Sequence, residues 1–148
     1  MEFVIHGFVR EKESGRPVPG LLVRAFDKDL LFTDLLGTAI TQENGSFILG
    51  YQGIDFRDLF ERRPDIYLDL YSSRVATDPA FSHDPPIFTT RRRVRFNAGR
   101  KEFFLIKIPR KTLGDDAPGM DVIEPPQEGE WKDGIDDFIE DNPLDFKY

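Results

Sequence analysis

The chain has 148 residues, of which 39% are hydrophobic and fourteen are Phe, enough apolar material for one domain with an appendage. It contains no Cys, which excludes disulfides and thiolate metal ligands. Charge is unevenly placed: residues 1–110 hold 17 Lys and Arg against 15 Asp and Glu, and residues 111–148 hold 3 against 12. We therefore predict a folded domain over residues 1–110, with a net charge of +2, and an acidic, Pro-containing C-terminal arm over residues 111–148, with −9.

Short apolar stretches separated by turn residues predict consecutive antiparallel strands at the start of the chain. Alternation of apolar and polar residues predicts two strands and then a loop or short edge strand, at residues 3–10, 21–27 and 30–36 respectively. Residues 37–42 and 46–50 are predicted to form a hairpin, because Asn44-Gly45 between them supplies the positive φ angles of a tight turn.

The pattern changes period after residue 53. Four apolar residues then share one broad helical face, which predicts one or two helical turns over residues 54–61. Beyond them we expect a long loop over residues 73–86, and strands at residues 65–72, 87–96 and 101–108. Seven or eight strands at this spacing, with one short helix and the extended acidic arm, predict an all-β sandwich of two sheets.

The more apolar face of each strand predicts the core of the sandwich. These inward residues are Ile5, Val9, Val23, Ala25, Ile40, Phe47, Ile66, Leu68, Leu70, Phe104 and Ile106. The opposite faces are also rich in apolar residues, namely Val4, Phe8, Leu22, Phe26, Tyr67, Tyr71, Phe103 and Leu105. Because large exposed apolar patches usually mark interaction surfaces, we expect this second face to contact another chain or the arm.

Several motifs carry a likeness to a known fold: Gly7-Phe8-Val9, SGRPVPG at 14–20, VRAFDKD at 23–29, LGTAIT at 36–41 and NGSF at 44–47. Together they resemble the transthyretin-like (prealbumin-like) β-sandwich, more loosely up to about Ile108. The resemblance implies an architecture and says little about chemistry.

Two enzyme classes are built on sandwiches similar to this family. Hydroxyisourate hydrolases carry several active-site histidines and a C-terminal Tyr-Arg-Gly-Ser motif, whereas this chain ends Asp-Phe-Lys-Tyr. Intradiol dioxygenases bind iron through two Tyr and two His that include a His-x-His element. Tyr67 and Tyr71 are available here, but the only histidines are His6 and His83. We therefore predict no catalytic residues, no metal site, no cofactor and no enzymatic activity.

Two smaller clusters of charged residues suggest chemistry, but we interpret both as parts of solvent-exposed loops. Asp27, Asp29 and Asp34 offer oxygen ligands for calcium, but they read better as a solvated loop, since no calcium-binding motif is present. His83 next to Asp84 suggests acid–base chemistry, yet it lacks a neighbouring nucleophile or further metal ligands and reads as part of a loop.

The sharpest charge feature is the run from Arg91 to Arg95. On a strand, Arg91, Arg93 and Arg95 would project to one face. Three interpretations stay open: contact with nucleic-acid phosphates, protection of an edge strand by charge, and binding of carboxylates from the arm or a partner. The acidic chain as a whole argues against general nucleic-acid binding.

The arm combines its carboxylates with spaced apolar residues. Trp131, Phe138, Ile139 and Phe146 are too apolar for a purely solvating tail, so we predict that they bind a partner or the domain itself. No signal peptide and no apolar run of membrane-spanning length is visible. We expect a cytoplasmic protein without membrane contact, although export by a signal-independent route stays open.

These observations predict a non-catalytic protein-interaction or assembly module that associates with a protein partner or with itself, as a component of a larger complex. The alternative is a small-ligand carrier that acts as a symmetric oligomer, as the transthyretin resemblance implies.

Overall fold

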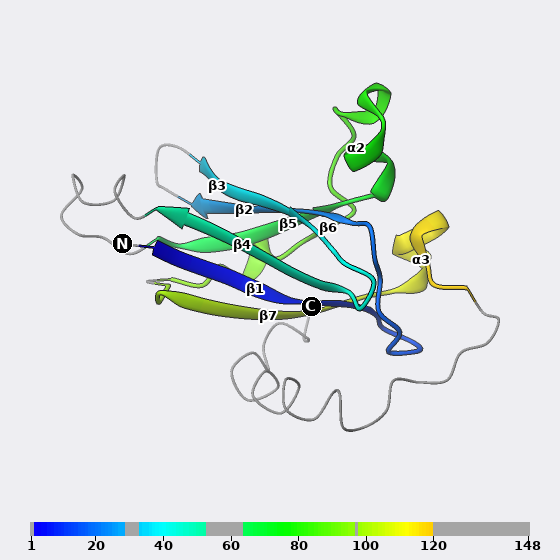
Figure 1. Ribbon diagram of the computed structural model, residues 1–148, viewed down its shortest axis with the longest axis horizontal. Helices are drawn as coiled ribbons and strands as arrows, with labels where there is room; N and C mark the ends of the chain where they lie inside the picture. Colours follow the sequence, from blue (N-terminus) through cyan, green and yellow to red (C-terminus); the bar gives the residue numbers. More distant parts are fainter. Residues whose placement is uncertain (1, 29–32, 53–63, 97, 120–148) are drawn as a thin grey trace.

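The chain folds into two β-sheets that pack face to face (Figure 1). The computed structural model describes residues 2–28, 33–52, 64–96 and 98–119. Within them, one sheet has the order β4-β1-β7 and the other the order β3-β2-β5-β6. The strands are β1 (Glu2–Glu11), β2 (Leu22–Lys28), β3 (Thr33–Ile40), β4 (Ser46–Gln52), β5 (Ile66–Tyr71), β6 (Phe88–Thr89) and β7 (Lys101–Ile108). The predicted all-β sandwich of two sheets is confirmed. The helix predicted at residues 54–61 lies outside the described residues.

Strand β1 is the centre of the first sheet. It pairs antiparallel with β4 and parallel with β7, so the first and last strands of the sandwich lie side by side. Gly7 lies opposite Phe104 of β7, and a Cβ atom there would overlap the carbonyl oxygen of Phe104. Only glycine allows this close approach between the two strands.

The core lies between the two sheets, and ten of the eleven predicted core residues are buried in it. Ile40 is the exception, with 52% of its surface exposed. The prediction for Ile40 is wrong because this residue pairs with Leu22, whose side of β2 faces away from the core. Ala39 and Leu36 pack against the core from β3 instead.

The predicted hairpin between residues 37–42 and 46–50 is also wrong. β3 and β4 belong to different sheets, and the turn at Gly45 (φ 80°) carries the chain from one sheet to the other. On one side of the turn, the Thr41 hydroxyl donates to Val18 O and accepts from Leu21 N at the start of β2. On the other side, Gly45 O accepts a hydrogen bond from Val9 N of β1. The two ends of the turn are therefore held by different sheets.

Residues 73–86, predicted as a loop, contain the helix α2 (Ser73–Thr77) and the 3₁₀ turn η1 (Pro79–Phe81). The Asp116 carboxylate accepts hydrogen bonds from Ser73 N at 3.1 Å and from the hydroxyls of Ser72 and Ser73. A carboxylate at this end satisfies amide groups that a helix start leaves unpaired. Because this cap comes from a residue 43 positions away, local sequence does not reveal it.

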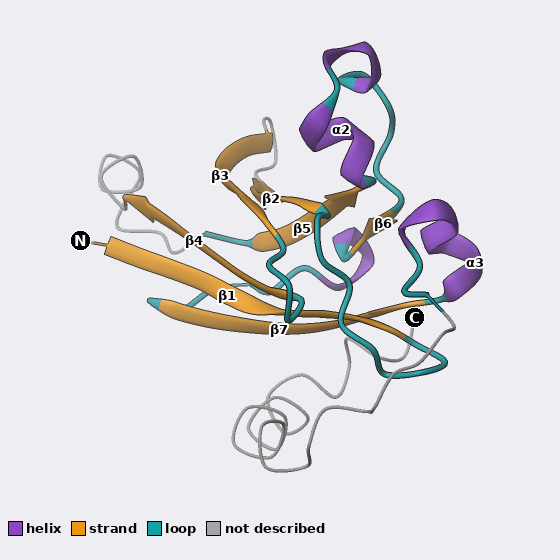
Figure 2. Cartoon of the chain, turned by 45° about the vertical axis from the view of Figure 1, so that its right-hand side comes forward, coloured by secondary structure: helices purple, strands orange, loops and turns teal. Residues whose placement is uncertain are grey.

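The chain after β7 packs on the body of the sandwich. Helix α3 (Arg110–Leu113) and the 3₁₀ turn η3 (Gly114–Asp116) lie at the same end of the sandwich as α2 (Figure 2). Leu113 belongs to the core, with 3% of its surface exposed. No helix among the described residues is long and apolar enough to cross a membrane.

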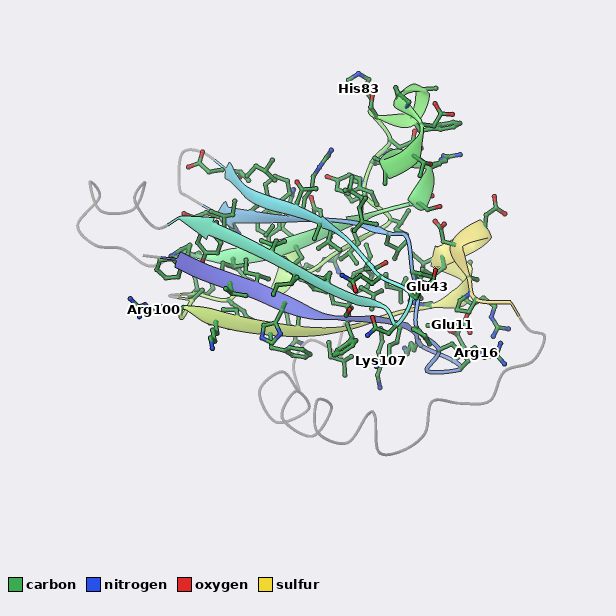
Figure 3. All side chains as sticks on the ribbon, in the orientation of Figure 1. Glu11, Arg16, Glu43, His83, Arg100 and Lys107 are labelled. Carbon is green, nitrogen blue, oxygen red and sulfur yellow. The ribbon has the colours of Figure 1, made fainter. Side chains whose placement is uncertain are left out.

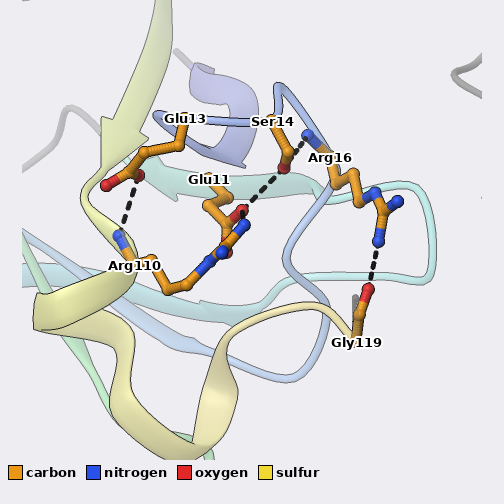
Figure 4. Close-up of polar contacts among 6 residues, drawn as sticks. All are labelled: Glu11, Glu13, Ser14, Arg16, Arg110 and Gly119. Carbon is orange, nitrogen blue, oxygen red and sulfur yellow. Dashed lines mark hydrogen bonds and ion pairs between the residues drawn. The ribbon is translucent and has the colours of Figure 1, made fainter. Parts of the chain in front are cut away.

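An ion pair joins α3 to the end of β1 (Figure 4). Arg110 Nη2 lies 2.7 Å from Glu11 Oε1, and its Nε donates to Glu11 Oε2 at 3.1 Å. The Ser14 hydroxyl donates to the same carboxylate at 2.7 Å. Hydrogen bonding from Arg110 is the largest cause that lowers the pKa of Glu11, whose side chain is fully buried. The carboxylate is thus buried in its charged form with its partners in place.

Candidate functional site

The outward side of the second sheet carries the densest group of aromatic and charged side chains. Because side chains alternate along a strand, the outward residues of β2 and β5 form three cross-strand pairs: Phe26–Tyr67, Arg24–Asp69 and Leu22–Tyr71. We call this surface the β2–β5 face. β3 borders it on one side, and β6 together with the following 3₁₀ turn η2 (Arg91–Arg93) borders it on the other.

Arginine side chains cover the tyrosine rings of the β2–β5 face. The guanidinium carbon of Arg91 lies 4.9 Å from the centre of the Tyr67 ring, and its Nη2 donates to the Tyr67 hydroxyl at 3.2 Å. Tyr67 in turn stacks on Phe26, with ring centres 5.3 Å apart and planes at 22°. Arg24 lies over Tyr71 at 4.7 Å in the same way. Such stacking holds each guanidinium group in one orientation.

Asp69 supplies the negative charge at the centre of the face. Its side chain is only 5% exposed, it accepts a hydrogen bond from the Thr89 hydroxyl at 2.5 Å, and it pairs with Arg91 at 3.7 Å. Arg24 is its neighbour across the strands. The Arg91 side chain, by contrast, is 58% exposed. The Asp69 carboxylate therefore binds its neighbours within the face, whereas the Arg91 guanidinium group is exposed to solvent.

A shallow groove of about 450 Å³ follows this arrangement, lined by Phe26, Thr33, Tyr67, Asp69, Tyr71, Pro86, Thr89 and Arg91. A neighbouring hollow of about 310 Å³ shares part of its wall and is lined by Pro86, Ile87, Phe88, Thr89 and Arg92. Leu35 and Ile40, which are 55% and 52% exposed, lie on the outward side of β3 next to the groove. The face thus combines exposed cations with exposed apolar surface.

The structure separates the three arginines that the sequence placed on one strand face. The strand predicted over residues 87–96 is interrupted: β6 ends at Thr89, η2 follows from Arg91, and strand pairing returns only as an isolated bridge between Arg95 and Ile66. The cause is Thr90, whose hydroxyl accepts from Leu68 N at 2.8 Å where a strand would use its carbonyl. The carbonyl of Thr90 instead accepts from Arg93 N at 2.8 Å, which begins the turn.

As a result, only Arg91 of the three reaches the groove. Arg95 turns toward the core, where its guanidinium carbon lies 3.6 Å from the centre of the Phe104 ring and its Nη1 pairs with Glu102 at 3.3 Å. Arg93 is partly buried within η2. The other predicted partner-binding residues, Trp131, Phe138, Ile139 and Phe146, lie outside the described residues.

The histidines and the Asp cluster lie apart from the groove. His6 packs edge-on against Phe103, with ring centres 4.9 Å apart, and burial together with the charge of Lys101 lowers its pKa. His83 is exposed and points away from the sandwich (Figure 3). Asp27 accepts a hydrogen bond from Asp65 N at 2.8 Å and lies opposite Asp34, while Asp29 is outside the described residues. In the described part of the chain, no three His, Cys, Asp or Glu residues are grouped as metal ligands would be.

Three residues of the face were not among the predicted site residues: Arg24, Asp69 and Thr89. The alternation of Arg24 with Val23 and Ala25 shows from sequence alone that it points outward. Nothing in the sequence shows that Asp69 and Thr89 are neighbours, because that contact depends on the pairing of β5 with β6.

No family model matches the sequence, and no curated protein matches it. Among solved structures, the chain is similar to a 9R-lipoxygenase from Cyanothece PCC8801, with a TM-score of 0.50 and 21% identity over 73% of this chain. The matched part is 16% of that chain. A dioxygenase domain of a carbohydrate-binding fusion protein from Streptomyces sp. SirexAA-E matches with a TM-score of 0.38 and 17% identity, over 73% of this chain and 79% of that one. The lipoxygenase match shows a likeness of fold alone.

Proposed function

We propose that this chain is a non-catalytic protein-interaction module whose β2–β5 face binds an acidic, partly apolar segment of a partner protein in a larger complex. The observation that carries the proposal is the pair of guanidinium groups, Arg24 and Arg91, held over the rings of Tyr71 and Tyr67. Because each group is already oriented, it loses little freedom when it pairs with a carboxylate.

The balance of exposed charge supports an acidic partner. Arg91 presents a side chain that is 58% exposed, while the Asp69 carboxylate is almost entirely covered. Arg92, which lines the adjacent hollow, is also exposed. The exposed Leu35 and Ile40 add apolar area beside these cations, as the centre of a protein interface requires.

The covered, hydrogen-bonded carboxylate of Asp69 supports a non-catalytic function for this face. A carboxylate that acts as a base or nucleophile needs access to a substrate. Here its oxygens already bind Thr89 and Arg91 and only 5% of the side chain is exposed. Asp69 therefore serves to position the arginine rather than to meet a ligand.

Binding to an array of synthetic peptides that vary in carboxylate and aromatic content tests the proposal. We expect the full chain to select acidic peptides with apolar residues, and we expect Arg91→Gln to lose most of that binding. Arg91→Lys keeps the charge without the planar stacking and should bind at an intermediate level. Arg100→Gln, which changes an exposed arginine of the loop before β7, is the matched control. Equal binding by Arg91→Gln and Arg100→Gln would refute the proposed site.

The groove also favours a second candidate, a small-ligand carrier. Its volume of about 450 Å³ and its three aromatic rings, Phe26, Tyr67 and Tyr71, suit a small molecule. A carrier of the transthyretin type requires a symmetric oligomer that encloses the site. Light scattering and native mass spectrometry decide this point, because a monomer without bound ligand excludes such a carrier.

A further inference from the structure

The outward side of the first sheet differs in character from the β2–β5 face. Strand register pairs four outward residues of β1 with four of β7, namely Val4 with Lys101, His6 with Phe103, Phe8 with Leu105 and Arg10 with Lys107. We call this surface the β1–β7 face. Lys107 projects from it on the side away from the second sheet (Figure 3).

The apolar residues of β7 on this face are shielded from water although they point away from the core, while Val4 and Phe8 of β1 are half-buried. Leu105 is 1% exposed and Phe103 is 7% exposed, and Phe8 packs against both. Side chains on one face of a sheet stand side by side and leave their ends open to whatever lies above them. On β4, the outward residue Ile48 is 63% exposed. The outward apolar residues are therefore most shielded on β7 and least shielded on β4.

The outward residues that pair between β1 and β7 carry charge of one sign. Arg10, Lys101 and Lys107 are the charged residues among them, and none of the eight outward positions that pair between the two strands holds a carboxylate. Arg10 lies over the Phe8 ring at 5.1 Å and is only 6% exposed. Burial lowers the pKa of Arg10 to about 10, so its cation gains from a carboxylate placed nearby.

Residues 120–148 have the complementary composition. They hold ten Asp and Glu against two Lys, and the same stretch contains Trp131, Phe138, Ile139 and Phe146. Ordering such a segment costs about 1–2 kcal/mol per residue in backbone entropy, so burial of its apolar side chains has to provide most of the binding energy. Exposed ion pairs add only about 0–1 kcal/mol each and act mainly to select the surface.

Residue 119, where the described part of the chain ends, lies close enough to the β1–β7 face for residues 120–148 to reach it. The Arg16 guanidinium donates a hydrogen bond to Gly119 O, which holds residue 119 beside the turn that follows β1 (Figure 4). The eight residues of β7 span roughly 27 Å at about 3.3 Å per residue. The 29 residues that follow Gly119 are long enough to run the length of the strand and return.

We propose that residues 120–148 cover the β1–β7 face of their own molecule, with their apolar side chains on Phe8, Phe103 and Leu105 and their carboxylates near Lys101 and Lys107. The contact lies on the opposite side of the sandwich from the groove that contains Arg91. It therefore stands independently of the proposed partner site, and either can fail without the other.

The chain's lack of Cys and its single Trp make a direct test simple. Bimane attached to Lys107→Cys in the full chain is quenched when Trp131 comes into contact range. We expect its emission to rise severalfold when Trp131→Phe is added. Bimane at Leu35→Cys, an exposed position on the other sheet, is the matched control and should not respond to Trp131→Phe. Lys101→Glu should restore part of the emission at low salt, because it repels the acidic segment.

Three outcomes would overturn the inference. Emission at position 107 that does not depend on Trp131 would show that this residue stays away from the face. Quenching at position 35 instead would place the segment on the second sheet. Quenching that disappears on dilution would show that a second copy, and not the same molecule, supplies the segment. Loss of peptide binding in Arg91→Gln leaves all three readings unchanged, which keeps this test separate from that of the partner site.

Discussion

Gly7→Ala should destabilise the sandwich strongly, because the methyl group has no space between β1 and β7. Beyond its overlap with the Phe104 carbonyl oxygen, the new Cβ would lie 2.8 Å from the carbonyl carbon of Phe104, where ordinary contacts begin at about 3.4 Å. The two strands therefore have to separate by more than the roughly 0.6 Å that the carbon contact alone requires, because the oxygen lies closer still. The Phe47 ring, 3.0 Å from the same Cβ, prevents β1 from yielding toward the core.

The size of the effect follows from three contributions. Overpacking of this kind costs about 1–3 kcal/mol. Stretching the two adjacent ladder hydrogen bonds adds about 0.5–1.5 kcal/mol for each bond that is lost. The lower backbone entropy of the unfolded Ala chain returns about 0.4–1 kcal/mol. We expect a net loss of about 2–4 kcal/mol in the free energy of unfolding, measured by urea denaturation with circular dichroism.

Gly99→Ala is the matched control. Its Cβ would meet the nearest atom, Glu102 Oε1, only at 3.5 Å, so we expect a change within about 0.5 kcal/mol. If Gly7→Ala and Gly99→Ala are equally stable, the parallel pairing of β1 with β7 is not as close as described, and the reasoning fails.

Three further changes test other parts of the structure. Phe47→Ala should lower the free energy of unfolding by about 2–5 kcal/mol, since Phe47 is buried. Ile48→Ala, on the exposed side of the same strand, should lower it by under about 1 kcal/mol. Similar losses in the two variants would mean that the faces of β4 are reversed. Burial lowers the pKa of His6, so the folded protein resists protonation there and stability should fall as pH drops below about 6.5. His6→Gln should flatten that part of the pH profile, and an unchanged slope would contradict the assignment. The pKa of Glu11 is lowered by Arg110, so its stabilising effect is complete above its ordinary value and is lost as pH falls through the lowered one. Glu11→Gln should therefore be less stable than the natural chain at about pH 7, and the difference should shrink in acid; a constant difference would show that the charge of Glu11 is not what matters.

The alternation of apolar residues was enough to predict most of the strands and the core. Strands were predicted at residues 3–10 and 101–108, and β1 and β7 occupy Glu2–Glu11 and Lys101–Ile108. Period-two patterns report which side of a strand is buried, and this information is local. The transthyretin-like resemblance and the docking of the arm through Trp131 stay predictions.

The candidate site was less accessible to sequence reasoning. The Arg91–Arg95 run was noticed, but it was assigned to a strand that ends at Thr89. Tyr67 and Tyr71 were predicted to lie on the outward faces and were considered as iron ligands, whereas in the structure they support arginine side chains. The outward position of Arg24 follows from its alternation with Val23 and Ala25, but its place over Tyr71 depends on the pairing of β2 with β5.

The sequence by itself determined where most of the strands lie and which side of each is buried, Ile40 excepted, because both depend on neighbours along the chain. Only the tertiary structure decided that β3 and β4 join different sheets, that Thr90 turns the chain into η2, and that Asp116 caps α2. Each of these depends on one or two hydrogen bonds to a residue at least 20 positions away. Such contacts leave no periodic trace in the sequence, and the pairing of β2 with β5 together with the turn at Thr90 brings Arg24, Asp69 and Arg91 onto one face.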